Sequence, residues 1–325
     1  MMIRQLVLAA ACVAGLATSA AAQTFPSRPV TFIVPYAAGG TTDVLARIIA
    51  KAMTTTLGQS VIVENAGGAG ATTGTLRVVR ATADGYVLSF GNMGSLAANV
   101  PLYPNLAFDP RKDLAPIGVV ARVPMVLSAS NKSGIRDLKG FIERLKNQDN
   151  PLSIGQAGPG STGHLAAARL LQLTETRATM VPYRGAGPAI ADLIAGFVDG
   201  VVDQTVTMIP AHQGGNARAL AVSSKARLPQ IPDVPTFAEA GLPAFDLTVW
   251  NAIAAPKDTP PAVVARLAQA LEAALASPEV QKTFAELAAE APGAEDRGPE
   301  PLRRLIAAEV DRLTDLIRSA GIRVE

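Results

Sequence analysis

Cysteine is almost absent from this chain of 325 residues, whose single cysteine, Cys12, lies in an apolar N-terminal stretch. Residues 1–22 have the pattern of a cleaved signal peptide, with basic Arg4, the apolar stretch, and alanines at 20–22 as a cleavage site. Cleavage after Ala22 removes Cys12 and leaves 325 − 22 = 303 residues. The mature chain then has no disulfide, thiol nucleophile or thiolate metal site. Because Cys12 lies inside the apolar stretch, the pattern favours a soluble exported protein over a lipoprotein.

A strong excess of one charge is missing as well. The formal net charge of +2 falls to +1 when Arg4 is removed with the leader. There is no polybasic run, so neither nucleic acid nor an anionic membrane surface is an expected partner. After the leader, no apolar stretch reaches the roughly 18 residues that a membrane helix needs. The mature length is sufficient for two ordinary domains.

Motifs that bind nucleotides, activate nucleophiles or hold metals are missing too. The glycines at 68, 70 and 74 are one residue too widely spaced for a dinucleotide fingerprint, and no Walker A sequence occurs. No G-x-S-x-G elbow occurs, and Ser161 has a nearby histidine but no evident orienting carboxylate. His164 and His212 are the only histidines, which offers no metal-ligand spacing. We therefore expect no cofactor and no metal, and treat a Ser161–His164 hydrolase as the alternative.

What the chain does contain is an alternation of strand-like and helix-like segments, which predicts α/β architecture with mainly parallel sheets. Expected strands lie at 61–64, 86–90, 152–154, 198–203 and 219–222, and expected helices at 71–80, 135–146 and from 186 to the glycine at 196. Residues 260–276, 278–289 and 302–320 read as three helices that pack back on the first domain. The proline-rich stretch 229–243 reads as a return crossing between domains.

The most informative stretch is residues 30–53. A short apolar run ends at Pro35, breaks at two glycines, and restarts with the spacing of an amphipathic helix. Thr41 or Thr42 is predicted to cap this helix, and Asp43 suits its first turn. A strand that feeds a helix through glycines leaves backbone N–H groups open, so it predicts an anion site without a basic side chain.

A second corner of the same kind spans residues 155–164. Its glycines precede a helix that Ser161 or Thr162 can cap. One such corner alone is equally well read as an ordinary tight turn. Two corners, one in each half of the chain, favour a ligand cleft shared between the halves. We read His164 as a structural residue before a ligand contact, since a helix N-terminus disfavours a protonated imidazole.

Three further side chains stand beside these corners. Asp203 ends an expected strand, at the sheet edge where open α/β folds place their ligands. It could accept a hydrogen bond from a ligand ammonium or a protonated acid, or be a surface residue at a strand end. Tyr36 and Tyr183 either form walls of the cleft or pack against a domain.

Together these segments resemble the tripartite tricarboxylate transporter receptor family, the extracytoplasmic Bug-type solute receptors. The matching segments cover most of the mature chain: 34–43 with Arg47, 63–65 with 68–70, 84–88, 160–161 with 164–165, 181–185, 218–222, and 232–236 with 239–241. Gln156, Pro159 and Asn216 depart from the usual family pattern, and Asn92 to Ser95 lie where the family contacts its ligand variably. The ligand's identity therefore stays open.

The resemblance implies a type II periplasmic binding protein: two α/β domains with a ligand cleft between them, closing like a Venus flytrap, and a C-terminal helical segment on domain 1. We expect domain 1 at 23–123 and 237–325 and domain 2 at 124–236. The expected ligand is a small organic anion, a carboxylate that could be an amino acid or an aromatic acid. Delivery to membrane transporter subunits, or to a membrane sensor, is the expected role of a periplasmic monomer that is not an enzyme.

The candidate ligand-binding residues combine both corners with their neighbours. They are Tyr36, Ala38, Gly39, Gly40, Thr41, Thr42, Asn92, Ser95, Gly158, Gly160, Ser161, Thr162, His164, Tyr183 and Asp203. Ser161 and Thr162 are expected to donate hydrogen bonds to one carboxylate, and Asp203 to sense the other end of the ligand. An amino acid or a cyclic amine would give Asp203 a cationic partner.

Overall fold

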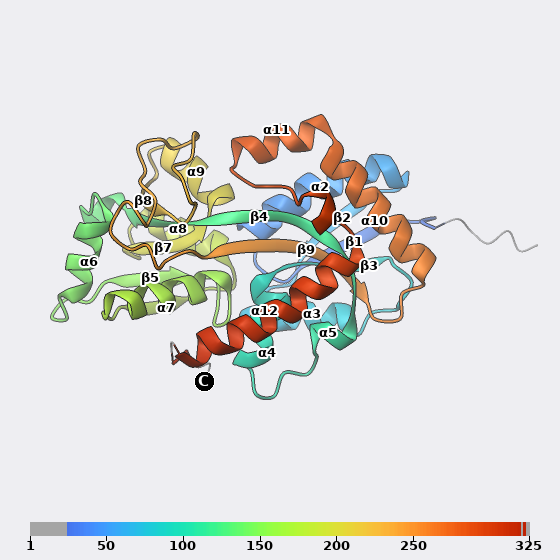
Figure 1. The fold of residues 1–325 in the computed structure, drawn as a ribbon, viewed down its shortest axis with the longest axis horizontal. Helices are drawn as coiled ribbons and strands as arrows, with labels where there is room; N and C mark the ends of the chain where they lie inside the picture. The colour runs from blue at the N-terminus through green and yellow to red at the C-terminus, as the bar shows by residue number, and fades with distance from the viewer. Residues whose placement is uncertain (1–24, 320, 323–325) are drawn as a thin grey trace, which may run out of the picture.

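The computed structural model describes residues 25–319 and 321–322. The predicted signal peptide, its cleavage site and Cys12 lie outside these residues. In Figure 1 the strands β4 and β9 run across the middle of the molecule and connect two groups of elements that lie side by side. The strand order is β2-β1-β3-β9-β4-β7-β5-β6, and β8 also pairs with β4.

We call the two groups lobe 1 and lobe 2. The strands of lobe 1 are β1 (Val30–Val34), β2 (Val61–Asn65), β3 (Val87–Asn92), β9 (Thr248–Pro256) and β4 (Leu114–Ser130) as far as Pro124. The strands of lobe 2 are β5 (Ser153–Gln156), β6 (Thr179–Pro182), β7 (Gly200–Gln204), β8 (Ala217–Val222) and β4 from Met125. The predicted domain boundaries at 123/124 and 236/237 remain a prediction.

Helices cover both lobes. Lobe 1 has α2 (Thr41–Leu57), α3 (Thr72–Val79), α4 (Asn99–Leu102), α5 (Pro110–Asp113), α10 (Pro261–Ala276), α11 (Pro278–Glu286), α12 (Pro299–Ser319) and the short helices η1 (Ala69–Ala71), η2 (Gly94–Ala98) and η4 (Ala294–Asp296). Lobe 2 has η3 (Asn131–Ser133), α6 (Leu138–Lys146), α7 (Thr162–Thr174), α8 (Ala186–Ala195) and α9 (Thr205–Gln213).

The sheet is mixed, so the prediction of mainly parallel sheets was wrong. Among the described strands, β1 pairs in parallel with β2 and β3, as β5 does with β6 and β7. The β3–β9 pair and every pair that β4 makes are antiparallel. The cause is the connection between the lobes, because β4 leads out of lobe 1 and β9 runs back beside it. The sequence reading missed β9 and took the two apolar runs of β4 separately.

The C-terminal helices return to lobe 1, as predicted. Helix α10 packs on α2 and β4, and α12 packs on β4 and α4. In Figure 1, α12 lies along the edge of lobe 1 and points toward lobe 2. The indole of Trp250 on β9 donates a hydrogen bond to Glu309 on α12 at 3.2 Å, which fixes the helix to the sheet.

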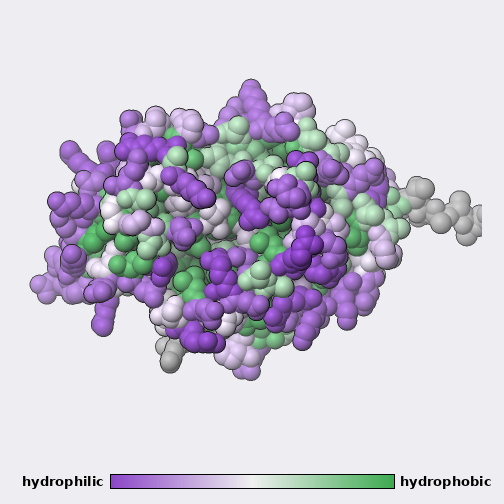
Figure 2. Space-filling model, viewed as in Figure 1, coloured by the Kyte–Doolittle hydropathy of each residue, from purple (hydrophilic) through white to green (hydrophobic). Residues whose placement is uncertain are grey.

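Apolar burial follows the alternation of strands and helices. Large side chains on both faces of the lobe 1 strands are fully buried, among them Phe32, Phe90 and Trp250, and Phe141 is buried in lobe 2. Figure 2 shows hydrophilic residues spread over the visible face, with smaller apolar areas between them. Within residues 25–319, no helix is both long and apolar enough to span a bilayer.

Candidate ligand-binding site

The first glycine corner joins β1 to α2. Helix α2 begins at Thr41 after Gly40, whose extended backbone makes it the N-cap without a side-chain hydrogen bond. The expectation that Thr41 or Thr42 caps the helix was therefore wrong, since both threonines lie in the first turn. With no cap, first-turn N–H groups have no partner within the helix and can donate to a group outside it. The N–H of Gly39, which precedes the N-cap, already has a partner, because it donates to Asp43 Oδ2 at 3.1 Å.

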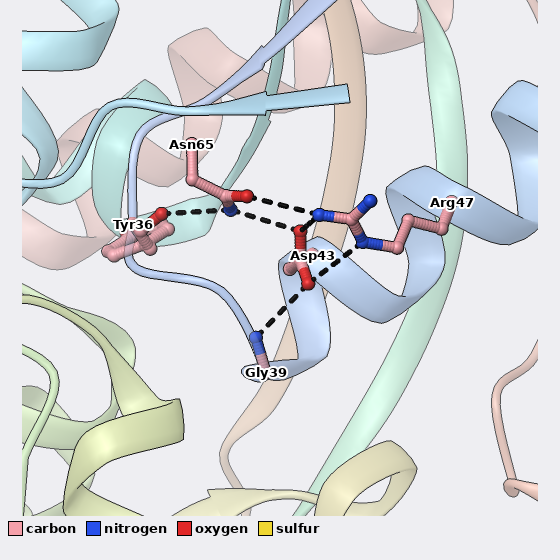
Figure 3. A network of polar contacts seen from close by, with 5 residues as sticks. All are labelled: Tyr36, Gly39, Asp43, Arg47 and Asn65. Carbon is pink, nitrogen blue, oxygen red and sulfur yellow. Dashed lines mark hydrogen bonds and ion pairs between the residues drawn. The ribbon is translucent and has the colours of Figure 1, made fainter. Parts of the chain in front are cut away.

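Asp43 fixes this corner through the network drawn in Figure 3, where the side chains of Arg47 and Asn65 converge on its carboxylate. Arg47 donates to both oxygens at 3.1 and 2.9 Å. Asn65 donates to Asp43 Oδ1 at 3.0 Å and to the Tyr36 carbonyl at 3.1 Å. Burial alone would raise the pKa of Asp43, but the bonds from Arg47, Gly39 and Asn65 outweigh it and hold that pKa below its usual value. Asp43 therefore stays ionised and is neutralised by Arg47.

The second corner joins β5 to α7, and here the cap prediction is confirmed. Ser161 is the N-cap of α7 and accepts a hydrogen bond from the backbone N–H of His164 at 3.2 Å. The Nδ1 atom of His164 in turn accepts the N–H of Gly160 at 3.1 Å. Burial lowers the pKa of His164, which favours the neutral imidazole that this acceptor role requires. In this arrangement His164 holds the turn in shape.

Two more helix N-termini face the same place. Helix α8 begins after Gly185 and α9 after Gln204, and neither N-cap has a side-chain hydrogen bond. Sequence reasoning counted two corners and so missed half of this arrangement. The signal for α8 was present in Gly185 followed by Pro188, an early-helix proline. Helix α9 gave little signal because its proline, Pro210, lies inside the helix.

All four helix N-termini meet at one small cavity of about 20 Å³. It is lined by Tyr36, Gly40, Thr41, Thr42, Asp43, Asn92, Ala157, Ser161, Thr162, Ala186, Asp203 and Gln204. Eight of these were predicted, and the structure adds Asp43, Ala157, Ala186 and Gln204. The lining contains no lysine, arginine or histidine. Backbone dipoles therefore supply the positive potential at this point.

The remaining predicted residues lie around the cavity without lining it. Ser95 supports Asn92, because its hydroxyl accepts the Asn92 N–H at 3.0 Å. The Tyr183 hydroxyl donates to Asp192 at 2.5 Å, a contact within lobe 2. The other predicted residues outside the lining are Ala38, Gly39, Gly158, Gly160 and His164.

A chain of side-chain amides and hydroxyls crosses from lobe 1 to lobe 2. Tyr36 donates to Asn92 Oδ1 at 2.9 Å, and Asn92 Nδ2 donates to Thr42 Oγ1 at 3.1 Å. Thr42 is 3.4 Å from Asn251 Oδ1, and Asn251 Nδ2 donates to Gln204 Oε1 at 2.8 Å. Each group holds the next, so the side chains of the cavity wall have a fixed orientation when the lobes are closed.

The lobes touch through backbone, and glycines make this possible. The N–H of Ala37 in lobe 1 donates to the carbonyl of Arg184 in lobe 2 at 3.0 Å. A Cβ added at Gly187 would lie 2.1 Å from the Ala38 carbonyl oxygen, closer than any side chain could approach. A cavity of about 20 Å³ holds a water but no dicarboxylate. The lobes must therefore separate to admit such a ligand.

Asp203 is one of two buried carboxyls that line the cavity, with 4% of its surface exposed against 5% for Asp43. Thr207 Oγ1 donates to its Oδ2 at 2.7 Å. Burial raises the pKa of Asp203 to about 6, against the opposing hydrogen bonds from Thr207 and the backbone of Gln204. The predicted strand end at Asp203 is one residue early, because β7 runs to Gln204. Asp203 lines the cavity between the lobes and is not a surface residue.

Larger grooves lie on the outside of lobe 1, about 720 Å³ between α10 and α12 and about 730 Å³ beside α3. Neither groove is lined by a residue from the first turn of α2, α7, α8 or α9, so size does not identify the site here. Within the described part of the chain, no group of three or more acidic, histidine or cysteine side chains could hold a metal ion.

A family model described as tripartite tricarboxylate transporter family receptor matches residues 45–322. The chain belongs to this family. Among its relatives, BugT of Bordetella pertussis is 35% identical over 96% of this chain and 95% of its own length. A UPF0065 protein of Agrobacterium vitis is 40% identical over 93% of this chain and 87% of its own length. The predicted membership of the Bug-type receptors is thereby confirmed.

Solved structures confirm the predicted periplasmic-binding-protein fold. The periplasmic binding protein BugD superposes with a TM-score of 0.89 at 36% identity, over 93% of this chain and all of that one. MatC of Rhodopseudomonas palustris with bound malate gives 0.87 at 38% identity, over 90% of this chain and 100% of that one. Rpa4515 of R. palustris with adipate gives a TM-score of 0.86 at 34% identity, over 92% of this chain and 99% of that one. This chain is thus a solute-binding receptor of the tripartite tricarboxylate type.

Proposed function

We propose that this receptor captures a small carboxylate in the cavity between its lobes. The observation that carries the proposal is the convergence of α2, α7, α8 and α9, whose N-termini meet where no basic side chain lines the wall. Oriented backbone N–H groups bind an anion without a counter-charge. The malate and adipate in two structural neighbours are small carboxylates, which supports the same class for this chain.

Helix N-termini and hydrogen bonds together can supply the binding free energy that a transport receptor needs. A helix N-terminus contributes about 0.3–1 kcal/mol to an anion, and up to ~2 kcal/mol when partly buried. A charge-assisted hydrogen bond adds roughly 1.5–3 kcal/mol. Four helix N-termini with two or three such bonds reach the roughly 8 kcal/mol of micromolar binding. An arginine clamp is therefore unnecessary, and the ligand can still be released.

The proposed ligand contacts come from both lobes. Backbone N–H groups of Gly40, Thr41 and Thr42 hold one carboxylate from lobe 1, with Tyr36 and Asn92 beside them. Ser161 and Thr162 donate from lobe 2. The Ser161 hydroxyl accepts the His164 N–H in the structure and keeps its own proton available for a ligand oxygen. Among the predicted residues outside the cavity lining, Ser95 holds Asn92, and His164 holds the turn at Gly160 and Ser161.

A hydrolase using Ser161 and His164 finds little support in the geometry. The Ser161 hydroxyl bonds to the backbone of His164, and the imidazole Nδ1 is occupied by the Gly160 N–H. A nucleophile needs a side-chain base within hydrogen-bond reach. Ligand binding without turnover is the function that we propose.

Cellular context follows from the leader and the family. We propose that residues 1–22 are cleaved after Ala22 and that the receptor works as a periplasmic monomer. Its partner would be the membrane subunits of a tripartite transporter, as the family description suggests. A membrane sensor would use the same cavity, and the family description favours the transporter.

Calorimetry against di- and tricarboxylates, amino acids and aromatic acids tests the proposal. We expect micromolar binding of at least one carboxylate, and a loss of at least about tenfold in Ser161→Val combined with Thr162→Val, since two donors are removed. Ser277→Val is the matched control, because Ser277 is an N-cap without a side-chain hydrogen bond in a helix that contributes no residue to the cavity lining. No binder in the panel, or equal binding by a folded double variant, would contradict the proposal.

A further inference from the structure

Asp203 differs from the other ionisable residues that line the cavity. Besides Asp203 these are Tyr36 and Asp43. Asp43 is neutralised by Arg47, and burial raises the pKa of Tyr36 so that its hydroxyl stays protonated. Asp203 takes part in none of the ion pairs that the described residues form. It is a buried carboxyl that faces the anion site without a cation of its own.

The groups that face Asp203 offer no charge to compensate it. Helix α2 presents Thr41, Thr42 and the neutral Asp43–Arg47 pair. The other elements present uncharged groups: Asn92 of β3, Ala157, Ser161 and Thr162 at α7, Ala186 of α8, and Gln204 and Thr207 at α9. Across the sheet Asp203 lies opposite Val126 of β4. A ligand carboxylate that enters this cavity would therefore meet an ionised Asp203 at short range, which is unfavourable in a buried site.

A short chain of hydroxyls can satisfy Asp203 in either protonation state. Thr207 Oγ1 lies 2.7 Å from Asp203 Oδ2, 3.0 Å from the Gln204 carbonyl and 3.2 Å from Thr41 Oγ1. When Asp203 is ionised, Thr207 donates to it and Thr41 donates to Thr207. When Asp203 is protonated, it can donate to Thr207, which turns its own proton to the Gln204 carbonyl. Only hydrogens move, so the change of state needs no repacking.

We propose that the receptor captures an anionic carboxylate together with one proton, which Asp203 takes from solvent as the lobes close. This inference rests on the proposed function and names the regulation of the same site. The protonated acid then bonds within the hydroxyl chain or to a ligand oxygen, and the like-charge contact is removed. Asp203 thereby selects anionic ligands at neutral or lower pH, and high pH favours their release.

The position of the Asp203 pKa near 6 in the structure agrees with this behaviour. At pH 7.5 the unliganded carboxyl is almost fully ionised, so binding an anion has about one proton to take up. Because Asp203 stays protonated in the proposed complex, affinity for a dianion should fall by up to about tenfold between pH 7 and pH 8. The sign is set by the raised pKa in the complex, since the complex binds more protons than the free receptor.

Proton-linked calorimetry with malate and with adipate tests the inference. Each is titrated into the mature receptor at pH 6 to 8.5 in two buffers of different ionisation enthalpy, which counts the protons taken up. We expect about one proton per ligand near pH 7.5 in the wild type. Asp203→Asn should show none, and should bind at pH 8 as tightly as it does at pH 6. Asp258→Asn, at an exposed position in lobe 1, should behave like the wild type.

The outcomes separate the inference from the function on which it rests. Binding of either dicarboxylate by the wild type without proton uptake overturns the inference and leaves the carboxylate receptor intact. An unchanged pH dependence in Asp203→Asn does the same. Tighter binding of an amino acid than of both dicarboxylates, with no proton uptake, overturns it in favour of an ammonium partner for Asp203. Absence of binding at every pH by malate, adipate and the rest of the carboxylate panel refutes the proposed function as well.

Discussion

The two lobes present different chemistry to the cavity that they share. Lobe 1 contributes one helix N-terminus, at α2, and side chains that are bound to one another, such as Tyr36 to Asn92 and Asp43 to Arg47. Lobe 2 contributes three helix N-termini and the unpaired carboxyl of Asp203. Lobe 1 thus presents a fixed frame in which the Asp43 carboxylate is already neutralised by Arg47. Lobe 2 supplies most of the helix dipoles that face the cavity, together with Asp203, whose charge can change.

This contrast explains how binding can depend on closure. A ligand that meets lobe 1 alone is held by one helix N-terminus and a few neutral donors. When lobe 2 arrives, three more dipoles and the Ser161 and Thr162 hydroxyls act on the same anion. Most of the affinity should therefore appear only in the closed form.

The largest expected effect comes from keeping the lobes apart. Gly187→Ala places a Cβ where it would lie 2.1 Å from the Ala38 carbonyl oxygen, so the lobes cannot reach the observed distance. The contribution of the three lobe 2 helices, about 3 kcal/mol in total, should be largely lost, which weakens ligand binding by a factor of about 100. Calorimetry gives the affinity, and small-angle X-ray scattering shows whether ligand still compacts the receptor.

The matched control is Gly140→Ala, a helical glycine of α6 whose added Cβ would lie 3.3 Å from Asp137 Oδ1, a contact that this exposed side chain can relieve by a small shift. It should leave affinity and compaction unchanged. Wild-type affinity in Gly187→Ala would show that the lobes do not close this tightly on a ligand.

A second expected effect concerns the pH dependence of stability in lobe 2. The folded pKa of Asp203 is raised from 3.8 to about 6, so the folded state holds the proton more tightly than the unfolded chain. This contribution to stability is complete below pH 3.8 and is lost as pH rises through 6. From 6 − 3.8 = 2.2 units, Asp203→Asn should gain up to about 3 kcal/mol over the wild type at pH 8. At pH 5 the advantage of Asp203→Asn over the wild type should be smaller than at pH 8 by about 1.4 kcal/mol.

Urea unfolding of the two proteins at pH 5 and pH 8 measures this difference. Asp258→Asn serves as the exposed control and should show no such trend. A difference between wild type and Asp203→Asn that is constant with pH would mean that the carboxyl does not titrate in this range.

In lobe 1, the pH dependence of the unfolding free energy that comes from Asp43 should have the opposite sign and a smaller size. The pKa of Asp43 is lowered by its bonds from Arg47, Gly39 and Asn65, so its stabilisation is present above pH 3.8 and lost as pH falls below it. Asp43→Asn should cost about 1–2 kcal/mol in unfolding free energy at pH 7 and less at pH 3.5. Asp84→Asn removes the exposed pair with Arg28 and should cost under about 1 kcal/mol. Equal costs for the two variants would argue against the frame role of Asp43.

The smallest expected effect separates a capped from an uncapped helix start. Ser161→Ala removes the acceptor for the His164 N–H and should cost about 1 kcal/mol, or roughly 2–4 °C in Tm. Ser277→Ala changes an N-cap that has no side-chain bond, so its Tm should move less. Differential scanning calorimetry of both variants is sufficient, and a larger loss in Ser277→Ala would contradict the assignment of the cap.

Local patterns predicted much of the fold. The apolar run of β1, the glycines and the helical spacing of α2 are neighbours in sequence, and so are the glycines and Ser161 at α7. Strand β9 escaped prediction because its burial depends on pairing with β3 and β4, which lie more than 100 residues away in the chain. The mixed sheet has the same cause, since β4 and β9 run between lobes in opposite directions.

Eight of the twelve cavity-lining residues were predicted because each stands at a glycine corner, a strand end or a family motif. Ala186 and Gln204 were missed because nothing local distinguishes an alanine or a glutamine that stands at the start of a helix. The cap at Thr41 or Thr42 was predicted wrongly, because threonine is a favoured N-cap in general but here Gly40 has the extended backbone of that position. The raised pKa of Asp203 depends on burial by both lobes, which a sequence does not display.

The recognition surface formed by four helix N-termini also bears on how this receptor can change over generations. Backbone N–H groups are present whatever side chain a residue carries, proline excepted. Substitutions around the cavity can therefore alter the shape, polarity or proton affinity of its wall while the backbone N–H groups still bind the anion. Arginine-based clamps lack this tolerance, because a single replacement removes the charge. A receptor built this way can exchange one carboxylate for another in small steps, each of them still a functional binding protein.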